Sequence, residues 1–229
     1  MPPIKLVIFD IAGTIVEDRG EVLGAFASAL KKHQIPFTES ELQEWKGAAK
    51  REVIRHFVGR LPGWKSSESQ VVEAAYCDFR RLLEEHYNRE TVPISGADTT
   101  FAWLRERGIQ IATTSGFYRE VAQLILEKAG WTQTFGANIS SSDVALGRPA
   151  PFMIFRAMEA TGVTSVQDAM NVGDTPLDLQ AGTNAGVLGV VGVLTGLHKE
   201  DRFRREPHTD LVPSVADLPM LLEEKYSAG

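Results

Sequence analysis

The chain has 229 residues, of which 43% are hydrophobic and 24% are charged, so it can bury a sizeable core as an ordinary globular protein. Its formal net charge of −6 and its lack of a long basic run argue against a partner that is a nucleic acid or an anionic membrane. The single cysteine excludes an intrachain disulfide, and because the sequence shows neither a signal-peptide pattern nor a bilayer-spanning apolar run, we expect a soluble, cytoplasmic protein.

Four short apolar runs have the pattern of strands that are buried on both faces of a sheet. They are residues 5–10, 108–116, 167–175 and 185–193. Helical patterns lie between the later runs, at residues 118–130, 149–162 and 175–186. Because strands that alternate with helices form parallel sheets through right-handed crossovers, we predict an α/β fold with a parallel sheet.

Residues 19–92, between the first run and the second, have a different pattern. They contain no convincing buried strand, and they show three helical stretches, at residues 21–35, 39–61 and 69–87. We therefore expect an all-helical insert that covers the active edge of the sheet as a lid. Residues 1–18 and 93–229 then make up the sheet domain.

Carboxylates stand at the ends of the first and third apolar runs, and ligands of parallel sheets bind beyond such strand ends. Asp10 precedes a turn with Gly13 and is suited to attack phosphorus and carry an acyl-phosphate. Asp174 and Asp178 are four residues apart, on one face of a first helical turn, and offer the hard oxygen ligands that Mg²⁺ prefers. Taken singly, these residues are also explained by helix capping or surface charge.

The other strand ends and turns provide groups for an anion. Ser115 and Gly116 place a hydroxyl and backbone N–H groups ahead of a helix, which makes a phosphate cradle. Arg148 precedes a helix that opens with prolines, where a guanidinium can hold phosphoryl oxygens and the nucleophile. With Thr14 from the first turn, these residues predict a site for a small anionic substrate.

In this order the motifs resemble those of the haloacid dehalogenase superfamily of phosphohydrolases, and the resemblance covers the expected sheet domain. It implies a Rossmann-like parallel sheet core with helices on both faces, and a small all-helical cap of the C1 type at residues 19–92. It also implies that Ser115 binds the phosphoryl group and that Arg148 fixes its charge.

The same resemblance implies a magnesium site. Its ligands would be Asp10, the main-chain carbonyl of Ala12, and Asp174, with Asp178 in support. In most phosphatases of the superfamily a second aspartate, two residues after the nucleophile, protonates the leaving group and later activates water. Ala12 can do neither, and the loss of a general acid costs about 10²–10⁴ in rate.

One branch of the superfamily, phosphonatase or phosphonoacetaldehyde hydrolase, has alanine at this place. Its cap lysine forms a Schiff base with the aldehyde, so the carbon leaves as an enamine. The stretches "DIAGT" and "GRPAPFM" are similar to that branch, and Lys50, three residues after Gly47, matches the lysine. Desolvation or a neighbouring cation, Lys46 or Arg51, would lower its pKa for this role.

The chain also departs from that branch. It has Lys46 where the branch tends to have methionine, Val53 where it has histidine, and Gly20 where it has cysteine. Three functions therefore stay open: a Mg²⁺-dependent phosphonatase-like hydrolase of a small organophosphorus metabolite, a phosphate monoesterase, and a non-catalytic binding protein on the same scaffold. The helical cap is a candidate face for a homodimer.

Overall fold

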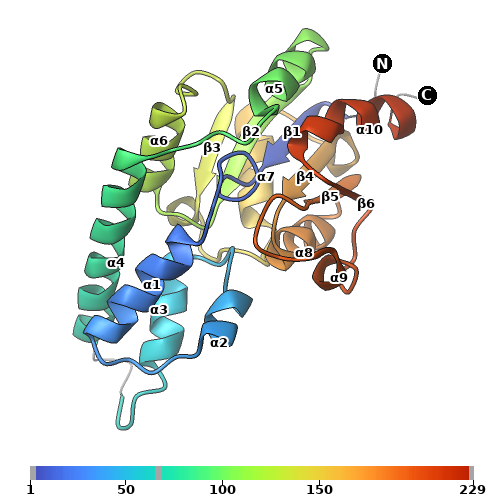
Figure 1. Cartoon of the computed structure of the whole chain (residues 1–229). Coiled ribbons are helices and arrows are strands. Elements are labelled where there is room, and N and C mark those ends of the chain that lie inside the picture. The colour runs from blue at the N-terminus through green and yellow to red at the C-terminus, as the bar shows by residue number, and fades with distance from the viewer. Residues whose placement is uncertain (1–3, 65–68, 227–229) are drawn as a thin grey trace.

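The computed structural model describes residues 4–64 and 69–226. Its centre is a six-stranded sheet in the order β3-β2-β1-β4-β5-β6, and every neighbouring pair of strands is parallel (Figure 1). The predicted α/β fold with a parallel sheet is confirmed. The strands are β1 (Leu6–Phe9), β2 (Gln110–Ser115), β3 (Ala137–Ser140), β4 (Ala169–Gly173), β5 (Gly189–Val193) and β6 (Asp210–Val212).

The two edge strands, β3 and β6, were not identified from the sequence. β3 has four residues and β6 has three, and both are only partly buried. Short edge strands lack the continuous apolar run that burial on both faces produces in the four inner strands.

Helices cover both faces of the sheet, because the side chains of each strand alternate between them. In β1, Val7 and Phe9 face one core and Leu6 and Ile8 face the other. The first core lies under α5 (Ala97–Glu106), α6 (Arg119–Lys128) and α10 (Leu218–Lys225). The second core lies under α7 (Phe152–Thr161), α8 (Pro176–Ala185) and α9 (Glu200–Phe203). The short 3₁₀ helices are Ser141–Asp143, Val166–Asp168 and Val215–Asp217.

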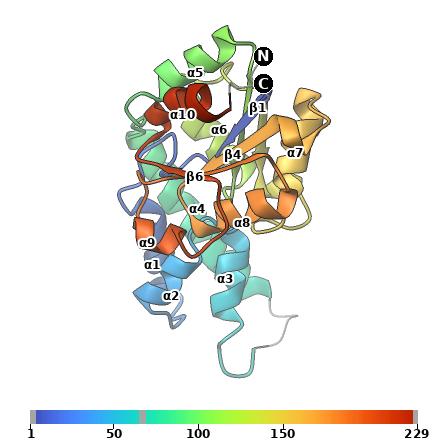
Figure 2. The same cartoon turned by 90° about the vertical axis from the view of Figure 1, so that its right-hand side faces the viewer.

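The remaining helices lie together beyond the carboxyl ends of the strands (Figures 1 and 2). They are α1 (Glu21–Lys32), α2 (Glu39–Glu44), α3 (Lys50–Val58) and α4 (Ser69–Arg89). α1 and α3 pack against α4, and α4 also packs against α6 of the sheet domain. We call residues 19–92 the helical insert. Among the described residues, none of the helices combines the length and apolar character needed to span a bilayer.

The single helical stretch predicted at residues 39–61 is wrong, because the structure has two helices there. Residues 45–49 separate α2 from α3, and Gly47 has a φ of 88°, a left-handed conformation that a helix does not contain. This interruption turns the backbone toward the sheet. It brings Lys46 and Lys50 to the strand ends.

The two connections between the insert and the sheet domain run side by side. The N–H of Glu17 donates to the carbonyl of Val92 at 2.9 Å, and the N–H of Ile94 donates to that of Ile15 at 2.8 Å. The two covalent connections between the insert and the sheet domain therefore lie next to each other. The residues on either side of them are therefore the natural place for a hinge.

Candidate active site

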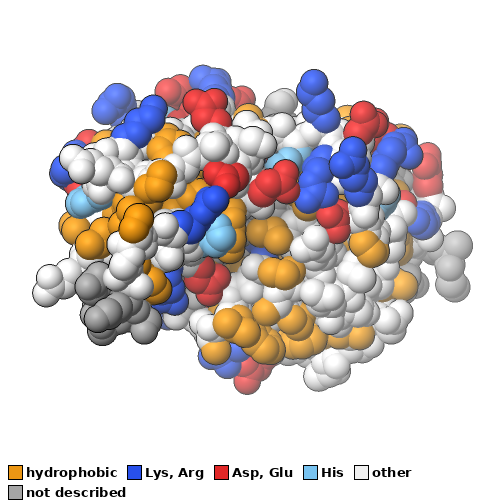
Figure 3. All heavy atoms as spheres, turned by 90° about the horizontal axis from the view of Figure 1, so that it is seen from below, with side chains coloured by type: hydrophobic (Ala, Val, Ile, Leu, Met, Phe, Trp, Pro, Cys, Tyr) orange, Lys and Arg blue, Asp and Glu red, His pale blue; other side chains and the backbone are white. Residues whose placement is uncertain are grey.

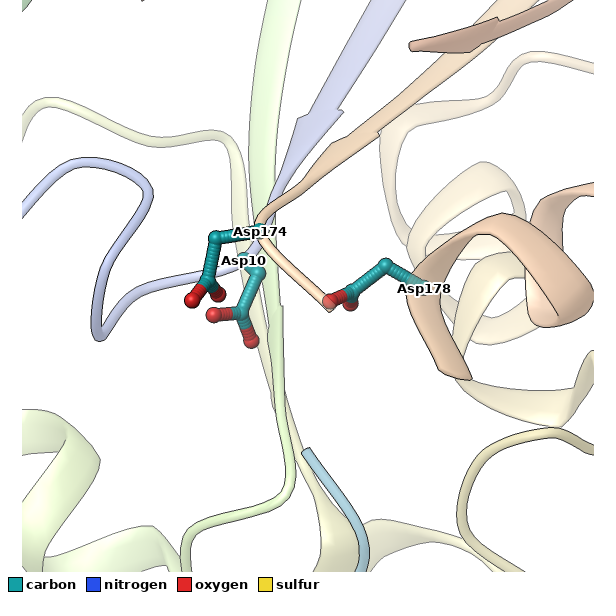
Figure 4. A group of neighbouring side chains, drawn as sticks. All are labelled: Asp10, Asp174 and Asp178. Atoms are coloured by element: carbon teal, nitrogen blue, oxygen red, sulfur yellow. The ribbon is translucent and has the colours of Figure 1, made fainter. Parts of the chain in front are cut away.

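Three buried carboxylates meet at the carboxyl ends of β1 and β4. Asp10 follows β1, and its N–H donates to the carbonyl of Val172 in β4 at 2.9 Å, so the two strand ends are held side by side. Asp174 follows β4. Asp10 and Asp174 lie together in Figure 4, and Asp178 points toward them from the first turn of α8. One oxygen of each lies within 4.8 Å of the others.

Asp178 is both a capping residue and a member of this group. Its Oδ2 accepts hydrogen bonds from the N–H of Thr175 at 3.0 Å and from the Thr175 hydroxyl at 2.6 Å, which completes the capping box of α8. Its Oδ1 is buried and receives no hydrogen bond from the described residues, although Nε of Arg148 lies 2.9 Å away. This oxygen is paired electrostatically with the Arg148 guanidinium, so Asp178 connects the capping box of α8 to the charged groups of the site.

The group fits a hard divalent cation. Burial raises the pKa of Asp174 to about 6 and that of Asp178 to about 7, because each carboxylate is removed from water and crowded by other negative charges. A bound divalent cation reverses this effect, since it favours the ionised carboxylates. Buried oxygen ligands in this number are those that Mg²⁺ uses in proteins.

The turn after Asp10 is shaped around Asp174. Gly13 has a φ of 91°, and a Cβ at this position would overlap the Asp174 carboxylate, so only glycine fits. The hydroxyl of Thr14 donates to Oδ1 of Asp174 over 3.4 Å. The structure therefore places Thr14 against the carboxylate, whereas the sequence predicted that it binds substrate.

Arg148 ties the nucleophile candidate to the rest of the site. It is 4% exposed, and it donates to Oδ1 of Asp10 at 2.6 Å. It also donates to the carbonyl of Thr114 at 2.8 Å and to the Thr114 hydroxyl at 2.9 Å. Burial opposes its charge, but Asp178 and Asp10 outweigh burial and raise the pKa of Arg148. The guanidinium is a fixed positive charge directly beside Asp10.

A small cavity lies between the sheet domain and the helical insert. Its volume is about 20 Å³, room for about one water molecule. Most of the predicted site residues line it, namely Asp10, Ala12, Lys50, Ser115, Gly116, Arg148 and Asp174. Thr14 and Asp178 are not among the lining residues. The structure thus gathers residues from five separate stretches of the chain around one cavity.

Lys46 lines the cavity on the side of the carboxylates. Its Nζ donates to Oδ2 of Asp174 at 2.7 Å and lies 3.2 Å from Oδ2 of Asp18. Burial disfavours the ammonium, but the charges of Asp174 and Asp18 outweigh burial and raise the pKa of Lys46. Lys46 is therefore a permanent cation at this site.

Lys50 lines the same cavity in different surroundings. Its Nζ lies 4.8 Å from the ring centre of Phe117, and it donates to the carbonyl of Ala48 at 3.3 Å. Burial, with smaller contributions from the charges of Arg148 and Lys46, lowers the pKa of Lys50 to about 8, although Asp10 opposes this shift. Lys50 is an amine that loses its proton far more readily than an ordinary lysine.

Of the two cations expected beside Lys50, Lys46 contributes to its lowered pKa and Arg51 needs correction. Arg51 is exposed and pairs with Glu73, so it is not the cation that acts on Lys50; Arg148, from the sheet domain, takes that place. Sequence reasoning also missed Asp18, which lines the cavity and holds Lys46. The sequence offers only a weak indication of this role: Asp18 is the third acidic residue, after Asp10 and Glu17, in the stretch "VIFDIAGTIVED".

On the described surface, basic side chains lie among acidic ones, as in a groove lined by Arg51, Arg80, Arg81 and Arg89 together with Glu73, Glu84 and Glu85. The face seen from the insert end carries basic, acidic and apolar side chains next to one another (Figure 3). Lys46, Lys50 and Arg148, by contrast, are all buried at the cavity. These three cations give the cavity a local positive charge that suits an anion, although the net charge of the chain is negative.

Comparison with known proteins agrees with this architecture. The model of the haloacid dehalogenase-like hydrolase family matches residues 7–192. A phosphonoacetaldehyde hydrolase of Hahella chejuensis (strain KCTC 2396) is 31% identical over 258 residues, which cover 96% of this chain and 86% of that protein. A bifunctional phosphonoacetaldehyde hydrolase/aminoethylphosphonate transaminase of Clostridioides difficile (strain 630) is 32% identical over 200 residues, or 82% of this chain. The match spans only 31% of that longer protein.

The fold is also similar to that of a solved structure. A phosphonoacetaldehyde hydrolase-like protein from Oleispira antarctica superposes with a TM-score of 0.82 at 23% identity. The superposition covers 97% of this chain and 92% of that one. At this identity the likeness concerns the fold alone, including the presence of both the sheet and the helices beyond its strand ends.

Proposed function

The chain belongs to the haloacid dehalogenase-like hydrolase family, and within it we propose that this hydrolase cleaves the carbon–phosphorus bond of a small aldehyde phosphonate such as phosphonoacetaldehyde. The observation that carries the proposal is the position of Lys50 in the same cavity as Asp10, beside an Ala12 that supplies no second carboxylate. The names of the Hahella and Clostridioides relatives support the same choice of substrate.

Lys50 carries out the first step. Its neutral amine adds to the aldehyde carbon, and loss of water leaves a C=N bond between Nζ and that carbon, which becomes an iminium when protonated. A pKa of about 8 leaves a useful fraction of the amine neutral at physiological pH, whereas an ordinary lysine with a pKa of about 10.4 is almost fully protonated. The contact with Phe117 keeps the amine among apolar atoms.

Asp10 carries out the second step. One of its carboxylate oxygens attacks phosphorus and forms an aspartyl-phosphate, while the electrons of the C–P bond move onto carbon and neutralise the iminium. The product on Lys50 is an enamine, which takes up a proton on carbon and is hydrolysed to acetaldehyde and free amine. Water then hydrolyses the aspartyl-phosphate to phosphate. Because the leaving carbon needs no proton when the bond breaks, the reaction does not need an acidic side chain at the position of Ala12.

The remaining residues bind and orient the phosphonate. Arg148 holds Asp10 in place and offers positive charge to the phosphoryl oxygens, and Ser115 and Gly116 supply donors at the end of β2. Asp10, Asp174 and Asp178, with the carbonyl of Ala12, would hold Mg²⁺, which neutralises phosphoryl charge when bound. The helical insert acts as the cap that excludes water from the cavity.

A phosphate monoesterase needs a proton donor for its leaving oxygen, and Asp18 is the carboxylate that could replace the missing one at Ala12. Burial opposes the ionised form, but Lys46 outweighs burial and lowers the pKa of Asp18. Asp18 therefore stays ionised near neutral pH and is a poor acid for an alkoxide. This disfavours the monoesterase alternative.

A substrate comparison tests the proposal. Purified full-length protein with Mg²⁺ is given phosphonoacetaldehyde, phosphoglycolate or a sugar phosphate, and both phosphate and acetaldehyde are measured. We expect phosphate and acetaldehyde in equal amounts from phosphonoacetaldehyde, and no product from Asp10→Asn. Efficient release of phosphate from the esters, unaffected by Lys50→Ala, would establish the monoesterase in its place.

A further inference from the structure

Lys46 joins the helical insert to the carboxylates of the sheet domain. It lies in the segment between α2 and α3, while Asp174 lies 128 residues later at the end of β4. The ammonium and the Asp174 carboxylate are both almost fully buried, with side-chain exposures of 5% and 0%. Asp18, the residue directly before the insert, lies on the other side of the ammonium. No step of the proposed reaction uses this cation.

We propose that Lys46 competes with the divalent cation for Asp174, so that the ammonium and the metal ion alternate on one carboxylate and metal binding loosens the insert from the sheet domain. The proposal rests on the proposed function, because it takes Asp174 as a ligand of that cation. It adds a role for Lys46 as the residue that couples metal binding to the opening of the cavity.

The contact with Asp174 is the polar centre of a closely fitted junction. Gly47 has a φ of 88°, and a Cβ there would overlap the Thr175 side chain, so the two backbones meet without space for a larger residue. The N–H of Lys50 donates to the carbonyl of Gly116 at 3.2 Å. Of the residues at this junction, Lys46 is in direct contact with a carboxylate. A change of charge at the carboxylates therefore acts on Lys46 first.

The size of the cavity requires this junction to open. A volume of about 20 Å³ holds about one water molecule, less than any organophosphorus substrate occupies. The insert must therefore move before a substrate enters. Movement of the Lys46 segment away from Asp174 widens the cavity on the side where the carboxylates lie.

Electrostatics makes the ammonium and the metal ion compete whether or not they use the same oxygen. An ammonium 2.7 Å from Asp174 already neutralises part of the charge that attracts a cation, and it repels a divalent ion nearby. A charge within a few ångströms changes a binding equilibrium by about tenfold or more. Metal binding in turn removes the attraction that holds Lys46.

The test measures metal affinity directly, without turnover. Metal-free full-length protein is titrated with Mn²⁺, and free Mn²⁺ is followed by electron paramagnetic resonance. We expect Lys46→Met to bind Mn²⁺ about tenfold more tightly than the natural chain. Lys46→Gln removes the same charge and keeps a polar side chain, so it replaces Lys46→Met if that variant does not fold. The matched control is Lys31→Met, an exposed lysine of the same insert, which should bind as the natural chain does.

Hydrogen exchange supplies a second readout that concerns the junction itself. In the natural chain, saturating Mg²⁺ should accelerate exchange of the Lys50 amide, which hydrogen-bonds to Gly116. In Lys46→Met that amide should already exchange fast before metal is added. Equal or weaker Mn²⁺ affinity in both Lys46 variants, or an amide that Mg²⁺ does not affect, would overturn the inference.

The result separates this inference from the proposed function. If the natural chain and the Lys46 variants bind Mn²⁺ equally well, the metal site stands and only the competition is refuted. If none of them binds Mn²⁺, the metal site of the proposed function fails and the inference fails with it. Loss of C–P cleavage activity alone would leave the expected difference in Mn²⁺ affinity intact.

Discussion

Two parts of one cavity treat a lysine in opposite ways. Lys46 and Lys50 are equally buried, at 6% and 5% exposure, and they are four residues apart. Lys46 faces Asp174 and Asp18, which raise its pKa, whereas Lys50 faces Phe117 and a backbone carbonyl, and its pKa falls to about 8. Burial alone therefore does not decide the chemistry of an amine. The carboxylates beside the amine decide whether it stays protonated. They divide this cavity into a cation side, around Lys46, and an amine side, around Lys50 and Phe117.

The largest expected effect comes from removing the nucleophilic amine while keeping its charge. Lys50→Arg should lower kcat/KM for phosphonoacetaldehyde by roughly 10⁴-fold or more, because a guanidinium cannot form the imine. The loss of kcat/KM is measured by the release of phosphate from phosphonoacetaldehyde. Arg51→Met, next in the sequence but exposed, is the control and should stay within about twofold of the natural chain. Substantial activity in Lys50→Arg would remove the distinction between the two lysines.

The second prediction uses pH to separate the two amines. Only the neutral form of Lys50 attacks the aldehyde, so kcat/KM should rise with pH and level off above a midpoint near 8. Between about pH 6 and 8 the neutral fraction grows by roughly 50-fold. Lys46 keeps its proton over this range and should add no second rise. A rate that is independent of pH across this interval would exclude Lys50 as the titrating group.

The third prediction gives Lys50 the surroundings of Lys46. Ala12→Asp places a further carboxylate in the cavity, which should raise the pKa of Lys50 and move the midpoint of the pH profile upward. At neutral pH we expect about a tenfold loss of phosphonoacetaldehyde cleavage. Ala12→Asn, with a similar shape and no charge, is the matched control and should leave the midpoint in place. A gain in C–P cleavage in Ala12→Asp would contradict this reading of Ala12.

The smallest effect is expected at Phe117, the aromatic residue next to Lys50. Phe117→Leu keeps an apolar contact for Lys50 but removes the aromatic ring, whose attraction for a buried cation is worth about 1–2 kcal/mol. Loss of that attraction should move the midpoint of the pH profile lower by about one pH unit and leave the rate above the midpoint unchanged. A kinetic pH profile measures the shift, and a move toward higher pH would show that the ring does not favour the protonated amine.

The sheet and its carboxylates were predictable from the sequence for a physical reason. Inner strands of a parallel sheet are continuous apolar runs, and three of the four runs end at a polar residue of the site, namely Asp10, Ser115 and Asp174. Edge strands β3 and β6 carry no such run. The signal for Asp178 was its spacing from Asp174, since four residues form one helical turn.

The helical insert was predictable as helices but not in its detail. Gly47 is a local signal for an interruption, but the close approach of its backbone to Thr175, far away in the sequence, is visible only in the fold. On either side of this contact, Lys46 meets Asp174 and Lys50 meets Phe117. A sequence shows two lysines on one amphipathic stretch, and only the fold shows which of them lies among carboxylates.

Chemical trapping of the imine tests the central claim most directly. Natural protein is incubated with phosphonoacetaldehyde, reduced with borohydride and digested, and the peptides that contain Lys46 and Lys50 are examined by mass spectrometry. We predict a reduced carbon adduct on Lys50, none on Lys46, and none in Lys50→Arg. Borohydride reduction that leaves Lys50 unmodified, in a protein that releases phosphate from phosphonoacetaldehyde, would contradict the account.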